Sequence, residues 1–363
     1  MPHIIYFVSP HGYGHAARAA AVIAEVTRLV PDARFTALTT VPRWFFDDSL
    51  DRRIDVEAVD VDLGLIQQDP FTENLAETLA ALQARIPFPE EALNTLASRV
   101  DALEGDLVVC DIAPIGLAVA RRCGLPSVLV ENFTWEWIYR GYQEACPPLG
   151  AVAGYLAEIF HSADHHVQTE PICSPAPGAQ RVAPVSRPPR MGRSATRRAL
   201  GVHGDAPMVV VTMGGVGWDD NALHMTRGED DPWFVIPGSP RHEHHDGVIR
   251  LPARSAFYHP DLIHAADVVV GKLGYSTLAE VWAAGVPFGY VPRPRFPESA
   301  PLEAWLQREL PCRRLTIEQL TSGDWLDAAR ELLAEGPCPP TRPGGAAATA
   351  RVLVDIVRPT REP

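Results

Sequence analysis

The sequence predicts an α/β protein with two domains, each built from alternating strands and helices. The chain of 363 residues is long enough for two hydrophobic cores. Short β-branched runs of the length of buried parallel strands precede glycine-rich turns and helical segments, which is the order of a βαβ unit. A proline-rich segment at 171–190 suits neither a helix nor a central strand. We therefore expect a first domain at 1–170, a linker at 171–190, a second domain at 191–345 and a terminal helical segment at 346–363.

The chain opens with an expected strand at Ile4 to Val8, followed by S-P-H-G-Y-G-H-A-A-R and a helix that runs to about Val30. Two glycines permit a tight turn at the helix start. His15 falls in the first helical turn, where the positive end of the helix favours a neutral imidazole that can accept a proton. His11 flanks the same turn and stays an alternative to His15. Both histidines could also be ordinary polar loop residues.

Further along the first domain, strands are expected at 35–38 and 54–59, and helical structure from 72 to 103 with a break at I-P-F-P. The run L-V-V-C-D at Leu107 to Asp111 reads as a buried strand that ends on a carboxylate. Open α/β sheets place their sites at the carboxyl ends of strands. Asp111 is therefore expected at the edge of the sheet where a site would form. The alternative is that Asp111 is the N-cap of the next helix, expected at 112–123.

An aromatic segment, E-N-F-T-W-E-W-I-Y-R-G-Y, follows the next expected strand, Ser127 to Val130. Aromatic and amide side chains just beyond a strand end can stack and hydrogen-bond a sugar or a flat acceptor. Asn132 and Trp135 are the candidates for contact with an acceptor. A helix packed on a core would contain the same residues, so that interpretation stays open. A helix at 151–162 and a short strand near His166 complete the domain.

The second domain begins with a basic helix at 191–200 and a strand at 208–212, which leads into M-G-G-V-G-W-D. This glycine turn, with Gly214 and Gly215, is weak as a dinucleotide fingerprint. The segment R-H-E-H-H-D-G at 241–247 follows no zinc spacing and is expected to be a solvated loop. A further strand is expected at 249–252.

The segment at 266–292 is the most informative part of the second domain. It contains a strand at 267–270, a glycine-rich turn, a helix from Ser276 that Gly285 ends, and a strand at 288–291. The free N–H groups of a helix start can hold an anion such as a diphosphate. Glu280, one turn further, could accept two hydrogen bonds from a vicinal diol such as a ribose. The alternative is that these residues only cap the helix and complement its dipole. The residues that would hold the anion are Gly274, Tyr275, Ser276 and Thr277.

The words G-K-L-G-Y-S-T-L-A-E and A-A-G-V-P resemble the donor half of nucleotide-sugar glycosyltransferases of the GT-B fold. With H-P-D-L-I-H-A-A-D before them and P-R-P-R-F-P-E after them, they are also similar to the glycosyltransferase-like half of plant arabinokinases, as is N-F-T-W-E-W-I-Y. The turn H-G-Y-G-H resembles the G-x-G-H of MurG-like and plant-type glycosyltransferases. The resemblance implies two Rossmann-like domains facing a cleft, with the segment 346–363 packed back on the first.

The resemblance also implies roles for particular residues. His15 would be the general base and Asp111 its orienting carboxylate, with Gly12 and Tyr13 on the acceptor side. In the donor half, the glycine turn would approach the phosphates and Glu280 would bind the ribose. The other donor contacts implied are Gly214, Gly215, Arg254, Phe257 and Glu298.

The implied reaction is the transfer of a sugar from a nucleoside diphosphate sugar, such as a UDP-sugar, to a small-molecule acceptor with inversion. The expected enzyme uses no metal and no cofactor beyond this co-substrate, in cytoplasmic biosynthesis. Two alternatives stay open. The chain could be a catalytically silent sugar-nucleotide-binding module, or a sugar-nucleotide epimerase of similar architecture.

Composition narrows the classes of partner. The net charge of −13 argues against a nucleic-acid or membrane-surface role, because phosphate-rich surfaces require a basic face. The cysteines form no C-x-x-C pair and are expected to be reduced thiols of the cytoplasm. The N-terminus has no basic region with a long apolar run, and no apolar stretch reaches the length of a membrane span. A homodimer stays open.

Overall fold

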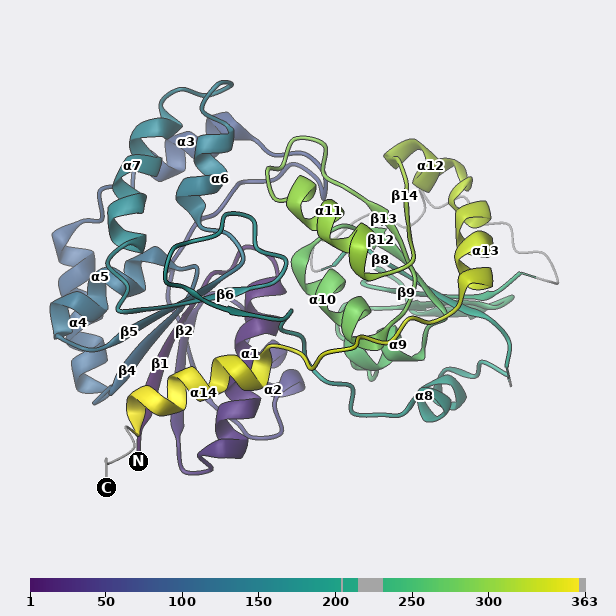
Figure 1. Cartoon of the computed structure of the whole chain (residues 1–363), viewed down its shortest axis with the longest axis horizontal. Coiled ribbons are helices and arrows are strands. Elements are labelled where there is room, and N and C mark those ends of the chain that lie inside the picture. The colour runs from purple at the N-terminus through teal and green to yellow at the C-terminus, as the bar shows by residue number, and fades with distance from the viewer. Residues whose placement is uncertain (204, 215–230, 359–363) are drawn as a thin grey trace. The chain divides into compact units, whose positions relative to one another are not determined.

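The computed structural model describes residues 1–203, 205–214 and 231–358 (Figure 1). These residues form two compact units. The first unit comprises 1–67, 73–186 and the described chain from 344, and the second comprises 68–72 and 187–343. Both are α/β units built on a mostly parallel sheet, which confirms the predicted fold class.

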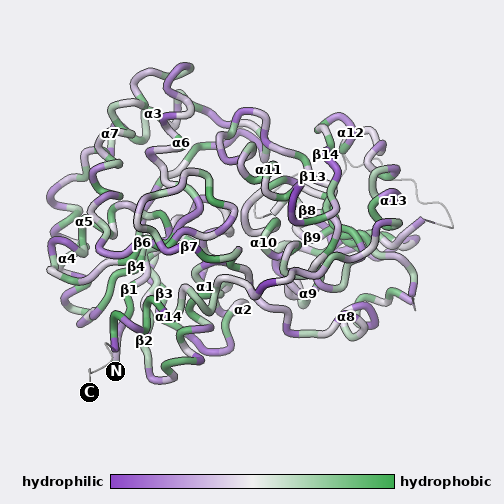
Figure 2. The backbone as a smooth tube through the Cα atoms, in the orientation of Figure 1, coloured by the Kyte–Doolittle hydropathy of each residue, from purple (hydrophilic) through white to green (hydrophobic). Residues whose placement is uncertain are grey.

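The first unit is built on a sheet of parallel strands in the order β3-β2-β1-β4-β5-β6-β7. Its central strands are buried on both faces and hydrophobic along their length (Figure 2), as parallel strands covered by helices must be. The strands are β1 (His3–Val8), β2 (Arg34–Thr39), β3 (Asp55–Ala58), β4 (Leu107–Asp111), β5 (Ser127–Glu131), β6 (His165–Thr169) and β7 (Gln180–Val182).

The helices of the first unit cover its sheet. One hydrophobic core lies under α1 and α14, which pack beside each other (Figure 1). Gly345 allows the chain to reach α14, because a Cβ there would lie 2.1 Å from the Ala183 carbonyl oxygen. The helices are α1 (Gly14–Leu29), α2 (Arg43–Ser49), α3 (Leu75–Gln83), α4 (Glu90–Ala102), α5 (Pro114–Cys123), α6 (Trp135–Gly141), α7 (Leu149–Phe160) and α14 (Ala346–Val357).

The second unit has a sheet in the order β10-β11-β9-β8-β12-β13-β14, in which only the described pair β10 and β11 is antiparallel. Phe71, from the short segment 68–72, packs against the core of this unit. The strands are β8 (Met208–Thr212), β9 (Trp233–Pro237), β10 (Glu243–His245), β11 (Val248–Leu251), β12 (Val268–Lys272), β13 (Phe288–Val291) and β14 (Cys312–Arg314). The helices are α8 (Arg193–Leu200), α9 (His259–Ala265), α10 (Tyr275–Ala284), α11 (Ser299–Glu309), α12 (Ile317–Ser322) and α13 (Trp325–Glu335).

Two short edge strands differ from the sequence-based expectations. Within the segment expected to be a linker, 171–190, residues 180–182 form β7, which pairs with β6. The compact first unit continues to Ser186. The segment expected to be a solvated histidine loop forms β10, paired with β11. Both strands are only three residues long and mostly exposed, so no hydrophobic pattern marks them in the sequence.

Candidate active site

His15 and Asp111 meet at the carboxyl edge of the first sheet. The ends of β1 and β4 are in register, with Val8 opposite Asp111, and α1 starts at Gly14, so His15 follows directly. The Nδ1 atom of His15 lies 2.9 Å from Oδ1 of Asp111, and both side chains are buried. An ionised carboxylate accepts a hydrogen bond from Nδ1–H, so in the neutral ring Nε2 of His15 carries no proton and is basic. The predicted pairing is therefore present in the structure.

The alternative role of Asp111 as a helix cap is wrong. The N-cap of α5 is Ala113, and no side chain caps this helix. Ile112, which separates Asp111 from the cap, has a positive φ of 48°. That conformation is unusual for a β-branched residue and turns the chain sharply directly after the carboxylate.

Arg18 is a third member of this group that the sequence interpretation missed. It lies one turn after His15 on α1 and is almost completely buried. Its Nε and Nη2 atoms donate to Oδ2 and Oδ1 of Asp111 at 2.8 and 2.6 Å. Its Nη1 atom donates to Asn132 at 3.0 Å and to Thr169 at 3.3 Å. The spacing H-x-x-R on a buried helix face was the signal available in the sequence.

The charge state of Asp111 follows from these contacts. Burial alone would raise the pKa of this carboxyl, but the charge and hydrogen bonds of Arg18, with those of His15, hold the pKa below its usual value. Asp111 is therefore an anion throughout the neutral range. It can orient the imidazole of His15 and stabilise an imidazolium without taking the proton itself.

His11 occupies a different place from His15. Its ring meets the ring of Trp135 edge-on, with centroids 5.1 Å apart. It also packs against Gly64, where a Cβ would lie 2.6 Å from Nδ1 of His11. The structure thus pairs His15, and not His11, with the Asp111 carboxylate. Which of the two is the base stays a prediction, and the carboxylate contact favours His15.

Two residues predicted to contact an acceptor are fully buried. Asn132 accepts from Arg18, and Trp135 donates from Nε1 to Asp62 at 2.5 Å. Both side chains are buried in this structure, so the direct contact predicted for them stays a prediction that their burial does not favour. The interpretation of the segment as a helix packed on a core fits better, and both residues instead support polar side chains of the site. Tyr13, half-exposed beside Gly12, stacks on Phe45 at 5.0 Å.

Asp62 is a second carboxylate of this corner that no motif marked. It lies in the loop after β3 and is half-buried. Burial raises the pKa of Asp62 to about 6, against hydrogen bonds from Ser9, Trp135 and the Leu63 amide and the charge of His15, which lower it. Asp111 and Asp62 are thus two carboxylates near one imidazole with different proton affinities.

In the second unit, the start of α10 offers an anion site. Its N-cap, Gly274, makes no side-chain capping bond, and the first turn holds no acidic residue that would repel an anion. Ser276 is half-buried and Thr277 buried in that first turn, next to Tyr275. This arrangement favours a bound anion such as a phosphate.

Lys272 stands at the end of β12, just before this helix, and is the only lysine of the sequence. Burial and the charge of Arg293 lower the pKa of Lys272 to about 7, although Glu298 opposes them. Within the described residues, the ammonium group of Lys272 makes no hydrogen bond or ion pair. A bound anion would therefore supply the partner that its ammonium group lacks. The motif G-K-L-G marks this position in the sequence, but the sequence interpretation assigned no role to Lys272.

Glu280 is held by two partners that the sequence interpretation also missed. Arg187 donates to Oε1 at 2.9 Å, and Nδ1 of His259 lies 2.8 Å from Oε2. Burial would raise the pKa of Glu280, but Arg187 and His259 hold it below its usual value. Nε2 of His259 lies 3.4 Å from Oγ1 of Thr212 at the end of β8. Glu280 is thus a fixed anion, and its role as a dipole partner for α10 is not needed to explain its position.

The other residues predicted to contact the donor differ from one another in exposure and in their contacts. Gly214 has a positive φ of 71° and donates from its amide to Thr212 at 3.2 Å, whereas Gly215 lies outside the described residues. Glu298 is buried and pairs with Arg293 at 3.3 Å. Arg254 is exposed and Phe257 half-buried in the loop after β11. Their proposed contacts with a nucleotide stay predictions.

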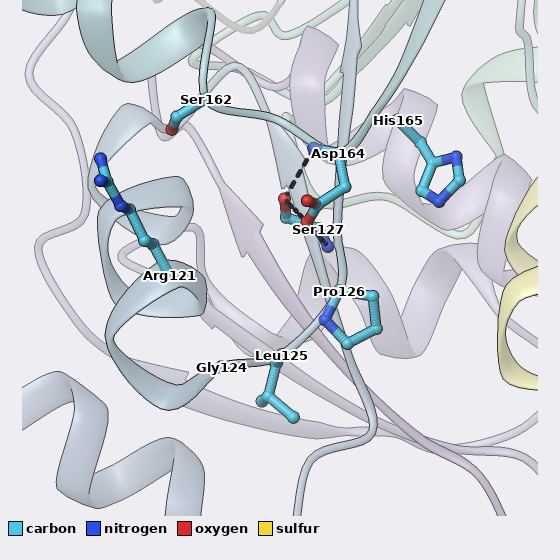
Figure 3. A pocket seen from close by; sticks show the side chains of 8 residues that line it. All are labelled: Arg121, Gly124, Leu125, Pro126, Ser127, Ser162, Asp164 and His165. Carbon is cyan, nitrogen blue, oxygen red and sulfur yellow. Dashed lines mark hydrogen bonds between the residues drawn. The ribbon is translucent and has the colours of Figure 1, made fainter.

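A cavity of about 640 Å³ lies elsewhere (Figure 3). It surrounds Ser127 and His165, the first residues of β5 and β6, and so opens at the amino edge of the first sheet, opposite the edge of His15. Ser127 and Asp164 point toward each other there and share three hydrogen bonds, at 2.7, 2.9 and 3.1 Å (Figure 3). We do not assign the chemistry to this cavity.

Comparison with known proteins identifies the fold. Residues 2–144 match the family described as Glycosyl transferase family 1. Over the whole chain, the structure is similar to the spinosyn forosaminyltransferase SpnP, with a TM-score of 0.59, 15% identity and coverage of 99% of this chain and 95% of that one. The chain has the GT-B fold. MurG of Acinetobacter baumannii is similar with a TM-score of 0.52 and 18% identity, covering 97% of this chain and 95% of that one.

Two other similar proteins are named for different activities. L-arabinokinase of Arabidopsis thaliana is 28% identical over 354 residues, which are 92% of this chain. The chain spans about a third of the length of that relative, 32%. A protein from Listeria monocytogenes, titled a putative UDP-N-acetylglucosamine 2-epimerase, is similar with a TM-score of 0.57 and 13% identity, covering 100% of this chain and 98% of that one. These findings confirm the predicted relation to GT-B glycosyltransferases and to arabinokinases.

The described residues contain neither a candidate metal site nor a helix that could span a membrane. Among the described residues, no group of three or more His, Cys, Asp and Glu side chains is placed to hold a metal ion. None of the described helices has both the length and the apolar character needed to cross a bilayer.

Proposed function

We propose that this protein transfers a glycosyl group from a nucleoside diphosphate sugar to a hydroxyl of a small-molecule acceptor, with inversion at the anomeric carbon. The observation that carries this proposal is the buried hydrogen bond between His15 and Asp111 at the carboxyl edge of the first sheet. A free histidine at a helix start has many uses. One whose Nδ1 is held by an ionised carboxylate is arranged as a general base.

On the acceptor side, Nε2 of His15 takes the proton of the attacking hydroxyl. The acceptor oxygen forms a bond to the anomeric carbon while the bond from that carbon to the diphosphate oxygen breaks. A single displacement of this kind inverts the configuration. Asp111 stabilises the imidazolium that forms, and Arg18 keeps Asp111 ionised in its buried position.

On the donor side, the diphosphate is held by the N–H groups at the start of α10 and by Lys272. These groups would also stabilise the charge that develops on the leaving diphosphate, so the proposed mechanism assigns that task to the protein. Glu280, fixed by Arg187 and His259, keeps lone pairs for a ribose diol. The proposed donor contacts also include Gly214, Gly215, Arg254, Phe257 and Glu298.

An epimerase acting on a sugar nucleotide is the second candidate. It is favoured by the similarity to the putative epimerase from Listeria monocytogenes and by the presence of two carboxylates, Asp62 and Asp111, near His15. Such an enzyme needs no acceptor. A catalytically silent binding module would keep the donor contacts and show neither activity.

One experiment separates the three. The protein is incubated with UDP-, dTDP-, ADP- and GDP-sugars, with and without a mixture of small hydroxylated acceptors, and products are followed by NMR. We expect a nucleoside diphosphate and a new glycoside only when the acceptor is present, and loss of both in His15→Ala. Isomerised donor without acceptor would favour the epimerase. Bound but unchanged donor under all conditions would favour the silent module.

A further inference from the structure

Asp62 is a carboxylate beside His15 that the proposed chemistry does not use. Its Oδ2 accepts from Nε1 of Trp135 at 2.5 Å and its Oδ1 from the Leu63 amide at 2.9 Å. The Ser9 hydroxyl adds a third hydrogen bond. All three partners can donate, so the protein binds Asp62 as an anion. The residue as a whole is half-buried, so it lies near the protein surface.

The loop that carries Asp62 is held firmly. Tyr139 donates from its hydroxyl to the Gly64 carbonyl at 3.0 Å. Gly64 has a positive φ of 66°, and a Cβ there would lie 2.6 Å from His11 and 2.9 Å from Trp135. The position of Asp62 therefore depends on the same H-G-Y-G-H turn that presents His15. Ser9 links them directly, because its hydroxyl oxygen also accepts from the His11 amide at 3.4 Å.

The ionised carboxylate of Asp62 is poorly solvated, because burial removes water from around it. Burial raises its pKa to about 6 despite the three donors and the nearby charge of His15. The other titratable groups that interact with it are Tyr139, whose own high pKa keeps it neutral, and Arg85, which pairs with Asp60. Among the described residues, no cationic side chain forms a hydrogen bond or ion pair with Asp62. A ligand that donates a hydrogen bond would complete its solvation.

The aromatic side chains around Asp62 give no flat surface for a ligand. Trp135 is 0% exposed and stacks on Tyr139, with ring centroids 5.8 Å apart. Phe133, 4% exposed, meets Trp135 edge-on. The groups of this corner that remain partly exposed include His11 and Asp62, which are polar. The surface next to Asp62 thus suits a hydrogen-bonding ligand better than a planar apolar one.

We propose, on the basis of the function proposed above, that Asp62 binds a hydroxyl or ammonium group of the acceptor next to the hydroxyl that His15 deprotonates. The acceptors of this protein are then polyhydroxylated or amino-substituted small molecules and not flat aromatic ones. Asp62 acts as a specificity residue: it accepts a hydrogen bond from the acceptor and takes no part in bond breaking.

The test uses saturation-transfer NMR on the full chain with UDP present. One set of probes is glucose, glucosamine and myo-inositol, and the other is 2-naphthol and umbelliferone. Wild type, Asp62→Asn and Asp62→Ala are compared with Asp60→Asn, which removes a carboxylate two residues away that is exposed and paired with Arg85. Unfolding curves establish that each variant is folded, and Asp62→Asn keeps the shape of the side chain if Asp62→Ala does not fold.

We expect the polyol and amine probes to bind wild type and Asp60→Asn equally, and to bind both Asp62 variants at least about tenfold more weakly. Binding to wild type should also weaken below about pH 6, and this dependence should be absent in Asp62→Asn. If Asp62 binds an ammonium group, glucosamine binds wild type more tightly than glucose; if it binds a hydroxyl, the two bind alike.

Preference for the phenols, binding of neither set, or unchanged polyol binding in the Asp62 variants would overturn the assignment of Asp62. The failure of the proposed function is distinguishable from this. If wild type binds none of UDP, dTDP, ADP or GDP in the same spectra, the proposed glycosyl transfer fails, and the inference that rests on it fails with it. If a nucleotide binds and only the Asp62 effect is missing, the inference alone fails.

Discussion

Arg18 binds both carboxylate oxygens of Asp111, at 2.6 and 2.8 Å, and both side chains are buried. The bidentate geometry is the strong form of an arginine–carboxylate pair. It explains how a carboxylate can remain ionised in the core while its other contact orients His15.

Loss of Arg18 should destabilise the protein strongly. Arg18→Met leaves the Asp111 carboxylate buried with only His15 as a partner, which typically costs about 3–5 kcal/mol. Urea unfolding measures the free energy of unfolding. The control is Arg28→Met. Arg28 is exposed and, among the described residues, forms an ion pair only with Glu25, three residues earlier on the same helix. Its loss should therefore cost less than about 0.5 kcal/mol. Equal stability of the two variants would show that Arg18 does not neutralise Asp111.

Glu280 should matter for the donor. Glu280→Ala is expected to weaken UDP binding by about 1–3 kcal/mol, the usual range for loss of charge-assisted hydrogen bonds. Because the change also releases Arg187 and His259, His259→Gln serves as a comparison that disturbs one partner but keeps the carboxylate. Calorimetry should show a larger loss for Glu280→Ala than for His259→Gln. Unchanged affinity in both variants would contradict the ribose contact.

Lys272 should make nucleotide binding depend on pH. In the free protein its pKa is about 7, and a bound diphosphate favours the charged ammonium. Affinity for UDP should therefore be highest below pH 7 and fall as the pH rises above it. Lys272→Met should bind UDP about 10–100-fold more weakly at pH 6.5, with little change in affinity toward pH 8.5.

Two controls accompany the Lys272 prediction. Reductive ¹³C-methylation reports the titration directly, because Lys272 is the only lysine. Since burial lowers its pKa from 10.5, the cost to stability is fully present below pH 7 and fades as the pH rises toward 10.5. Lys272→Met should therefore stabilise the free protein by about 2 kcal/mol at pH 6 and by less at pH 9. A lysine that titrates near 10.5 would contradict this description.

Asp62 should reveal its raised pKa in the stability of the protein. A carboxyl whose folded pKa is about 6 against an unfolded value of 3.8 binds its proton more tightly in the folded state, so stability falls as the pH rises from about 4 to 6. Asp62→Asn should then stabilise the protein by about 1–2 kcal/mol at pH 7.5, after allowance for partial exposure, and by less at pH 5. An equal effect at both pH values would contradict the raised pKa.

Much of the fold and the pairing of His15 with Asp111 could be predicted from the sequence. Strand runs such as 107–111 carry a local signal, and the rule that sites lie at carboxyl strand ends brought Asp111 to His15. Arg18, Arg187 and His259 could not be assigned, because their partners are distant in the chain and depend on how the elements pack. The burial of Trp135 was missed for the same reason, since an aromatic run after a strand reads equally as a ligand surface or as core. The three-residue edge strands β7 and β10 have too little hydrophobic pattern to be predicted.

The measurement that tests the central claim most directly is the turnover of His15→Ala. If His15 is the general base, the turnover number should fall by about 10²–10⁴-fold while donor affinity stays nearly unchanged, because base catalysis contributes about that much. Asp111→Asn should have a smaller effect in the same direction, His11→Ala should keep most of the activity, and the acid limb of the pH–rate profile should be lost in His15→Ala. Wild-type turnover in His15→Ala, or a loss of donor binding equal to the loss of turnover, would contradict the proposal that His15 deprotonates the acceptor.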